Sequence, residues 1–226
     1  MLTRSVEDYL KTIYRLQRKE AGVTTNALAA EMAVSPASAS NMIKKLAQLR
    51  LVEHAPYRGV VLTATGEKVA LEVIRHHRLL ELYLSQALGV SLERVHQEAD
   101  RLEHVLSEEL EERIAASLGE PTHDPHGDPI PGRDGTVAEA HYPLLSDLRA
   151  GQGGTIVRVS DRNPEVLRDL AGAGLLPGTE VRVLQVAADG GLRVRTEGAE
   201  QDLSRRLADA VHVAASPAAL TPDHAS

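Results

Sequence analysis

Apolar side chains recur every three or four residues in three segments at the start of the chain, which is the period of an amphipathic helix. We predict helices over residues 5–19, 25–32 and 36–48, and the third begins with a proline that fits a first helical turn. Two short apolar runs, 51–54 and 60–63, flank a turn and predict a hairpin. Three helices, with a three-residue turn between the second and third, followed by a hairpin, are typical of a winged helix-turn-helix.

The rest of the chain divides into a helical part and a strand-rich part. Helical periodicity predicts one helix over 65–88 and a second over 91–118, with a break near Ser107. Proline and glycine dominate residues 119–154, which predicts a connecting region that is partly ordered at best. The final part predicts a small β-barrel with a short turn at 203–207 and strands over 155–159, 180–186, 192–196 and 210–214.

The predicted fold class is therefore mainly α-helical with a small C-terminal β-barrel. The expected domains are a winged helix-turn-helix domain (1–72), a helical domain (73–140), a linker (141–152), the barrel (153–215) and a disordered tail (216–226).

Composition removes several classes of function. The chain has no cysteine, so it has neither a disulfide framework nor a thiolate zinc site. It also lacks tryptophan and phenylalanine, which argues against aromatic stacking on single-stranded nucleic acid. No apolar run approaches the roughly 18–20 residues of a membrane span, and no signal peptide is evident, so we expect a cytoplasmic protein without a membrane partner.

Charge is distributed unevenly along the acidic chain, whose formal net charge is −7. Residues 1–65 hold nine Lys/Arg against five Asp/Glu, a balance of +4. Residues 66–150 hold eight against seventeen (−9), and 151–226 hold eight against ten (−2). One basic module in an acidic protein is compatible with DNA binding by that module, although ordinary variation of surface charge would produce the same balance.

Carboxylates and imidazoles gather on one face of the second long helix. Helical spacings of three, four and seven bring together His96, Asp100, Glu103 and His104. The preceding helix carries His77 and Glu81 four residues apart. Burying so many ionisable groups without a cation would be costly, so we predict a divalent metal. A solvated helix face and an internal salt-bridged cluster are the alternatives.

With these elements in this order, the chain resembles the diphtheria-toxin-repressor and manganese-transport-regulator family. The resemblance rests on Arg78-Leu79, residues 95–99 (VHQEA), 103–107 (EHVLS) and 127–132 (GDPIPG). It implies a metal-activated transcriptional repressor and not an enzyme. It also implies a homodimer formed through the helical domain, palindromic operator DNA as partner, control of metal-uptake genes, and an SH3-like (FeoA-like) barrel.

The resemblance also implies two metal sites per subunit. The primary ligands are Asp8, Asp100, Glu103 and His104, the ancillary ligands are His77, Glu81 and His96, and the barrel adds Asp161 and Glu165. Asp8 also fits a capping box after Ser5, which explains it without a metal. Asp8 follows the manganese branch, so Mn(II) is expected before Fe(II), with no organic cofactor. Lys11 replaces a carboxylate of the two-domain manganese regulators, which favours two separated sites over a close pair.

The winged helix supplies the expected DNA contacts. Residues at the start of the third helix meet base edges: Ser35, Pro36, Ala37, Ser38, Ser40 and Asn41. The expected phosphate contacts are Thr24, Thr25, Lys44, Lys45, Tyr57 and Arg58. Solubility alone is an equal explanation for the two lysines.

Two other functions fit part of this pattern. Carboxylate and imidazole ligands on helices also serve metalloenzymes, but the sequence offers no nucleophile–base pair or phosphate loop beside them. A winged-helix regulator that ignores metal, with an ion-pair cluster in place of the ligands, is the second alternative.

Overall fold

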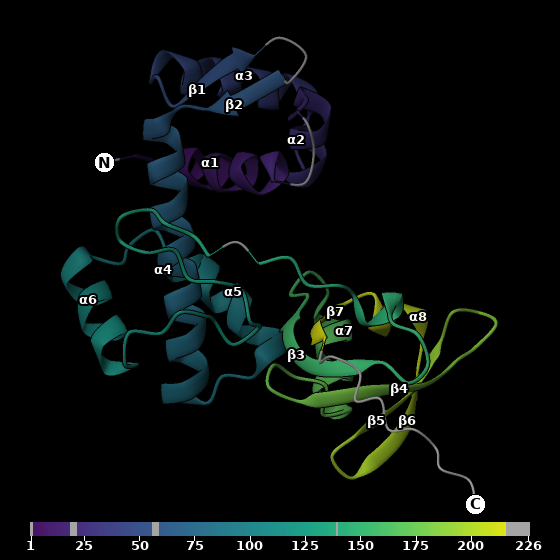
Figure 1. The fold of residues 1–226 in the computed structure, drawn as a ribbon. Coiled ribbons are helices and arrows are strands. Elements are labelled where there is room, and N and C mark those ends of the chain that lie inside the picture. Colours follow the sequence, from purple (N-terminus) through teal and green to yellow (C-terminus); the bar gives the residue numbers. More distant parts are fainter. Residues whose placement is uncertain (1, 19–21, 56–58, 139, 216–226) are drawn as a thin grey trace, which may run out of the picture. The chain divides into compact units, whose positions relative to one another are not determined.

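The computed structural model describes residues 2–18, 22–55, 59–138 and 140–215 (Figure 1). The chain divides into two compact units, which are described separately. We call them the winged-helix unit (1–80, 99–120 and 130–137) and the barrel unit (81–98, 121–129 and 138–226). Each unit is assembled from three stretches of chain, so neither coincides with one of the consecutive domains expected from the sequence.

The winged-helix unit follows the predicted order of elements. It contains α1 (Arg4–Gln17), α2 (Thr25–Glu31), α3 (Pro36–Gln48), β1 (Val52–Ala55), β2 (Gly59–Leu62), the first part of α4 (Ala64–Leu88), the end of α5 (Leu92–Leu102) and α6 (Glu108–Ser117). Strands β1 and β2 pair antiparallel, with Val52 opposite Leu62. Figure 1 shows these strands and α1–α3 gathered about the start of α4.

The core of this unit follows the apolar periodicity of α1. Its side chains at spacings of three and four are all buried: Val6, Tyr9, Leu10, Ile13 and Leu16. They share one cluster with Leu28 of α2 and with Ala39 and Leu46 of α3. The helices begin where capping groups stand, because Thr24 and Ser35 accept hydrogen bonds from backbone N–H groups of α2 and α3. A shared core means that a displacement of α1 displaces α3 with it.

One helix boundary differs from the prediction in a way that matters for the candidate ligands. The break predicted near Ser107 is present but begins earlier: α5 ends at Leu102, and Ser107 caps α6 by accepting from the Leu110 N–H. Glu103 and His104 lie in the turn between the two helices. The Glu103 N–H still donates to the Ala99 carbonyl at 2.9 Å, so this residue remains anchored to α5.

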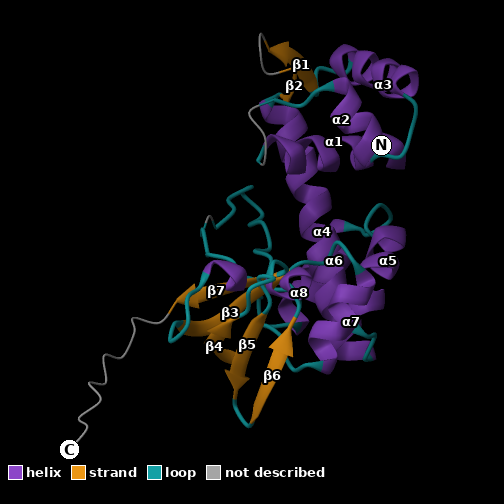
Figure 2. Cartoon of the chain, turned by 90° about the vertical axis from the view of Figure 1, so that its right-hand side faces the viewer, coloured by secondary structure: helices purple, strands orange, loops and turns teal. Residues whose placement is uncertain are grey.

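The barrel unit contains a five-stranded antiparallel sheet in the order β6-β5-β4-β3-β7 (Figure 2). Its elements after residue 138 are η1 (Leu145–Asp147), β3 (Gly153–Val159), α7 (Pro164–Gly172), β4 (Glu180–Val186), β5 (Leu192–Thr196), β6 (Ala199–Leu203), α8 (Arg205–Ala208) and β7 (Val211–Ala215). The four predicted strands are present as β3, β4, β5 and β7. Helix α7 and strand β6 have no counterpart among the predicted elements, and the turn expected near 203–207 is largely α8.

The segment 141–152 is not the separate linker that its proline and glycine content predicted. Leu145 is fully buried and Leu148 is 8% exposed, and both belong to the barrel core. Leu144 forms a β-bridge with His212 of β7. Burial of these apolar side chains fixes the segment to the barrel core in spite of the neighbouring proline and glycine residues. The segment is therefore part of the barrel unit. The expected disordered tail, 216–226, lies outside the described residues.

Hydropathy along the described helices does not reach the level of a membrane span in any of them.

Candidate metal centres

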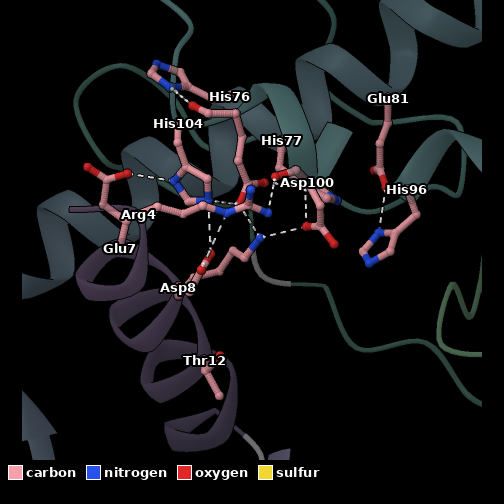
Figure 3. A network of polar contacts seen from close by, with 12 residues as sticks. Arg4, Glu7, Asp8, Thr12, His76, His77, Glu81, His96, Asp100 and His104 are labelled. Carbon is pink, nitrogen blue, oxygen red and sulfur yellow. Dashed lines mark hydrogen bonds and ion pairs between the residues drawn. The ribbon is translucent and has the colours of Figure 1, made fainter. Parts of the chain in front are cut away.

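Three polar side chains from distant parts of the sequence converge in the winged-helix unit, and we call them the first centre: Asp8, Glu103 and His104. Each offers a ligand atom within 4.8 Å of the other two. Nε2 of His104 lies 2.9 Å from Oδ1 of Asp8 and 3.2 Å from Oε1 of Glu103. Figure 3 shows the His104 imidazole facing the Glu7 and Asp8 side chains of α1. The first centre therefore joins α1 to the turn after α5.

The His104 imidazole shows that this cluster fits a cation. Its Nδ1 lies 2.6 Å from Oε2 of Glu7, which places the ring proton on that side. Its Nε2 is buried and has no hydrogen-bond partner among the described residues. The lone pair of Nε2 then faces the carboxylates of Asp8 and Glu103, an arrangement that a divalent cation between them would satisfy.

Three further side chains border the first centre. Oδ1 of Asp100 lies 3.1 Å from Nζ of Lys11 and 3.4 Å from Nδ1 of His77. His77 also makes a short contact with Glu103. Burial raises the pKa of Glu103, but His77 and Lys11 lower it by more, so this carboxyl ionises below its usual range. The structure thus places His77, expected as an ancillary ligand, beside residues expected as primary ligands.

A second cluster lies in the barrel unit, and we call it the second centre: Glu81, His96, Asp124, His126 and Asp161. Two triads share Glu81, one with His96 and Asp161 and the other with Asp124 and His126. Oε1 of Glu81 lies 3.0 Å from Nδ1 of His96, a pair labelled in Figure 3. Oε2 of Glu81 lies 3.6 Å from Nδ1 of His126. Oδ2 of Asp161 lies 3.8 Å from Nδ1 of His96.

The loop that carries Asp124 and His126 is fixed by its backbone. The His126 and Asp128 N–H groups both donate to Oδ1 of Asp124 at 2.9 Å. The His126 carbonyl accepts from the Val159 N–H of β3 at 2.8 Å. Gly127 has a φ of +88°, and a Cβ there would lie 1.9 Å from the Val157 carbonyl oxygen. Only glycine allows this close approach to β3, which sets His126 against the barrel.

His126 supplies the fit test for the second centre. The residue is fully buried, and its Nδ1 has no hydrogen-bond partner within the part of the chain that is described. It offers a ligand atom within 4.8 Å of carboxylate oxygens of Glu81 and Asp124, and the charge of Asp161 also acts on it. A buried imidazole with an unsatisfied nitrogen among carboxylates is a donor set that suits a divalent cation.

Comparison with known proteins assigns the chain to a family. Three family models match successive segments: the iron-dependent repressor N-terminal DNA-binding domain over 1–60, the iron-dependent repressor metal-binding and dimerisation domain over 63–132, and the FeoA domain over 144–215. The chain is 31% identical over 225 residues to the diphtheria toxin repressor of Corynebacterium glutamicum, covering 94% of this chain and 96% of that one. It belongs to the iron-dependent repressor family.

Other relatives and solved structures agree with this assignment. The iron-dependent repressor IdeR of Mycobacterium leprae is 31% identical over 226 residues, with 94% of this chain and 97% of that one covered. A manganese-dependent transcriptional repressor in complex with manganese is 41% identical, with a TM-score of 0.83 and 92% and 98% of the two chains covered. ScaR with bound Cd²⁺ is 32% identical, with a TM-score of 0.77 and 92% and 98% covered.

The resemblance drawn from the sequence is confirmed, as is the fold class of winged helix, helical region and SH3-like barrel. The family is one of metal-dependent, DNA-binding transcriptional repressors and not of enzymes, which removes the metalloenzyme alternative.

Two residues of the second centre, Asp124 and His126, were not among the predicted ligands, and one predicted ligand, Glu165, does not reach the centre. Asp124 and His126 lie in the region expected to be a partly ordered linker, and their Asp-x-His spacing was the only local signal. Glu165 instead lies in the first turn of α7 with a side chain that is 74% exposed, 4.0 Å from Arg206. Asn163 caps α7 and begins the helix so that Glu165 faces solvent.

Those expected DNA-contacting residues that the structure describes lie at the start of α2 and along α3. The exposed ones are Thr24, Ser35, Pro36, Ala37, Ser38, Asn41, Lys44 and Lys45, whereas Thr25 and Ser40 are half-buried. Ser35 also bonds Ser38 through their hydroxyl oxygens at 2.9 Å. Tyr57 and Arg58, expected in the wing, lie outside the described residues.

His126 predicts a pH dependence of the metal-free protein. Burial lowers its pKa, but Glu81, Asp124 and Asp161 raise it by more, from 6.5 to about 9. The folded state therefore holds the proton of the His126 imidazole more tightly than the unfolded state does. Its contribution to the stability of the folded state is complete below about pH 6.5 and is lost as the pH rises through about 9. With chelator present, the Tm of the parent protein should fall across this window more than that of His126→Gln. Parallel curves for the two proteins would refute this assignment.

Proposed function

We propose that the chain is a cytoplasmic, manganese-responsive repressor that acts as a homodimer on palindromic operator DNA of metal-uptake genes. The first centre carries this proposal. Asp8 belongs to the segment matched as a DNA-binding domain, and Glu103 and His104 belong to the segment matched as a metal-binding and dimerisation domain. Their ligand atoms lie within 4.8 Å of one another.

The donor types support Mn(II) over Fe(II). The first centre offers oxygens of Asp8 and Glu103 and one imidazole, with Asp100 at its edge. Carboxylate-rich sites suit Mn(II), whereas softer sites with thiolates favour other metals, and this chain has no cysteine. Because intrinsic affinity runs against Mn(II), its selection depends on geometry and on availability in the cell.

The coupling to DNA is a linkage through α1. Asp8 lies on α1, and α1 shares its core with α3, which carries the exposed residues expected at base edges. A bound divalent cation supplies the positive charge that lets Asp8 and Glu103 remain together. Holding Asp8 against Glu103 and His104 favours one placement of α3, and a dimer needs its two recognition helices spaced to match two half-sites. Preferential binding to that arrangement raises DNA affinity.

The second centre supports a second metal in each subunit. Glu81, Asp124 and His126 are each at most 7% exposed, and His96 and Asp161 complete the set. A cation there would neutralise buried carboxylates and hold the 121–129 loop near Asp161, the second residue after β3. We assign it a mainly stabilising role, because its donors all lie in the barrel unit.

Operator binding in the presence of different metals tests this function. A palindromic duplex, selected from random DNA against the Mn(II)-treated protein, should bind at least about tenfold more tightly with Mn(II) than with chelator. Anaerobic Fe(II) should give a smaller gain. Equal affinity with Mn(II) and chelator would favour the metal-independent regulator, and a larger gain with Fe(II) would reverse the choice of metal.

A further inference from the structure

Lys11 is an unusual residue to find beside a metal centre. It lies on α1 one turn after Asp8 and is 6% exposed, the only lysine among the buried residues that are described. Its Nζ lies 2.5 Å from Oε1 of Glu103 and 3.1 Å from Oδ1 of Asp100. A buried ammonium requires such carboxylate partners, so these two contacts hold it in place.

The ammonium of Lys11 contacts the same oxygen that faces the first centre. Oε1 of Glu103 lies 2.5 Å from Nζ of Lys11 and 3.2 Å from Nε2 of His104. The Glu103 side chain is fully buried, so water cannot screen a second cation near that oxygen. An ammonium and a divalent cation on one carboxylate oxygen repel each other strongly at low dielectric. Occupation by one therefore weakens occupation by the other.

We propose that Lys11 is an internal competitor for the cation position of the first centre. The inference rests on the proposed metal-binding function of that centre. In the metal-free protein the ammonium neutralises Glu103 and Asp100, and Nζ must leave Glu103 before a divalent metal takes that oxygen. Nζ of Lys11 can then stay paired with Asp100, whose side chain is 39% exposed and so lies partly in solvent. Lys11 thereby raises the metal concentration at which the repressor responds.

The charges around the first centre agree with this role. Glu7, Asp8, Asp100 and Glu103 bring four carboxylates; Lys11 contacts Asp100 and Glu103 with a full positive charge, and the His77 imidazole contacts the same two. Arg4 is 3.9 Å from Asp8 and largely exposed, so it neutralises the cluster far less. Removing the Lys11 ammonium should lower the stability of the metal-free protein. It should also strengthen the attraction between the carboxylates of the first centre and a bound metal ion. A merely structural lysine would show the first effect without the second.

Mn(II) titrations of full-length Lys11→Met and Lys11→Arg, beside the parent, test the proposal. Calorimetry with Mn(II) alone measures binding at each site. Binding at the first centre is identified as the step that is lost in Asp8→Ala. We expect Lys11→Met to bind Mn(II) there at least about tenfold more tightly, with a lower metal-free Tm, because the competing charge is gone. Lys11→Arg should stay within about threefold of the parent. Arg15→Met, one turn further along α1, controls for the change in net charge.

Each outcome has one meaning. Tighter Mn(II) binding by Lys11→Met at the first centre supports competition. If Lys11→Met does not fold, Lys11→Gln takes its place. The conclusion also holds if the parent protein shows no Mn(II) binding at the first centre. Equal or weaker binding by the folded variant overturns the role of Lys11 and leaves the metal centre standing. If neither the parent nor the variants show an event that Asp8→Ala removes, the first centre is not a metal site, and the proposed function fails with it.

Discussion

Asp8→Ala is expected to abolish the Mn(II) dependence of operator binding while the chain stays folded. Asp8 is the only donor of the first centre that α1 contributes, and its Oδ1 lies 2.9 Å from Nε2 of His104. Its side chain is 31% exposed, so alanine leaves little unfilled space. Losing one ligand should weaken Mn(II) binding there by at least about tenfold. Fluorescence anisotropy of the labelled operator, with Mn(II) and with chelator, measures the effect.

The matched control is Glu31→Ala, which removes an exposed carboxylate from α2 in the same unit. This variant should keep the parent's response to Mn(II). If Asp8→Ala kept the full response as well, Asp8 would not be a ligand and the linkage through α1 would be wrong. The capping box expected after Ser5 does not explain Asp8, because α1 begins at Arg4 and its N-cap is Thr3, without a side-chain cap hydrogen bond.

His126→Gln is expected to lower the Mn(II) content from two ions to one per chain and to remove part of the thermal stabilisation by Mn(II). His126 is fully buried and faces Glu81, whose side chain is 1% exposed. Glutamine fills much of the same volume but gives no imidazole nitrogen, so the buried carboxylates lose a ligand partner. Metal analysis after dialysis and Tm with and without Mn(II) are the measurements.

Glu165→Ala provides the control for the second centre, because Glu165 lies exposed on α7. It should retain two ions per chain and the parent's gain in Tm. A loss of one ion in this variant, or none in His126→Gln, would mean that the second centre is assigned to the wrong residues.

The sequence predicted those parts of the fold that local periodicity controls. The apolar spacing of α1 and the proline that begins α3 were sufficient, because each reflects how one helix buries one face. The sequence also predicted that Glu103 and His104 lie on one face, although it placed the helix break near Ser107, whereas α5 ends at Leu102. Glu103 still lies on the face expected from helical spacing, because its N–H continues the hydrogen-bond pattern of α5 for one more residue.

Features that depend on tertiary contacts were not predictable in this way. Asp124 and His126 become candidate ligands only when Gly127 packs against Val157 and the His126 carbonyl pairs with β3. Strand β6 has the sequence AEQDL, without alternating apolar residues, and forms because β5 pairs with it along its whole length. The contact of Lys11 with Glu103, 92 positions apart in sequence, likewise has no local signal.

The most direct test of the central claim is the Mn(II) affinity of the parent protein measured with and without a saturating operator duplex. If the first centre and DNA binding are linked, thermodynamic reciprocity requires the operator to tighten Mn(II) binding by the same factor by which Mn(II) tightens operator binding. We expect that factor to be at least about tenfold and to vanish in Asp8→Ala. An Mn(II) affinity that is unchanged by the operator would contradict the claim that this centre couples metal to DNA.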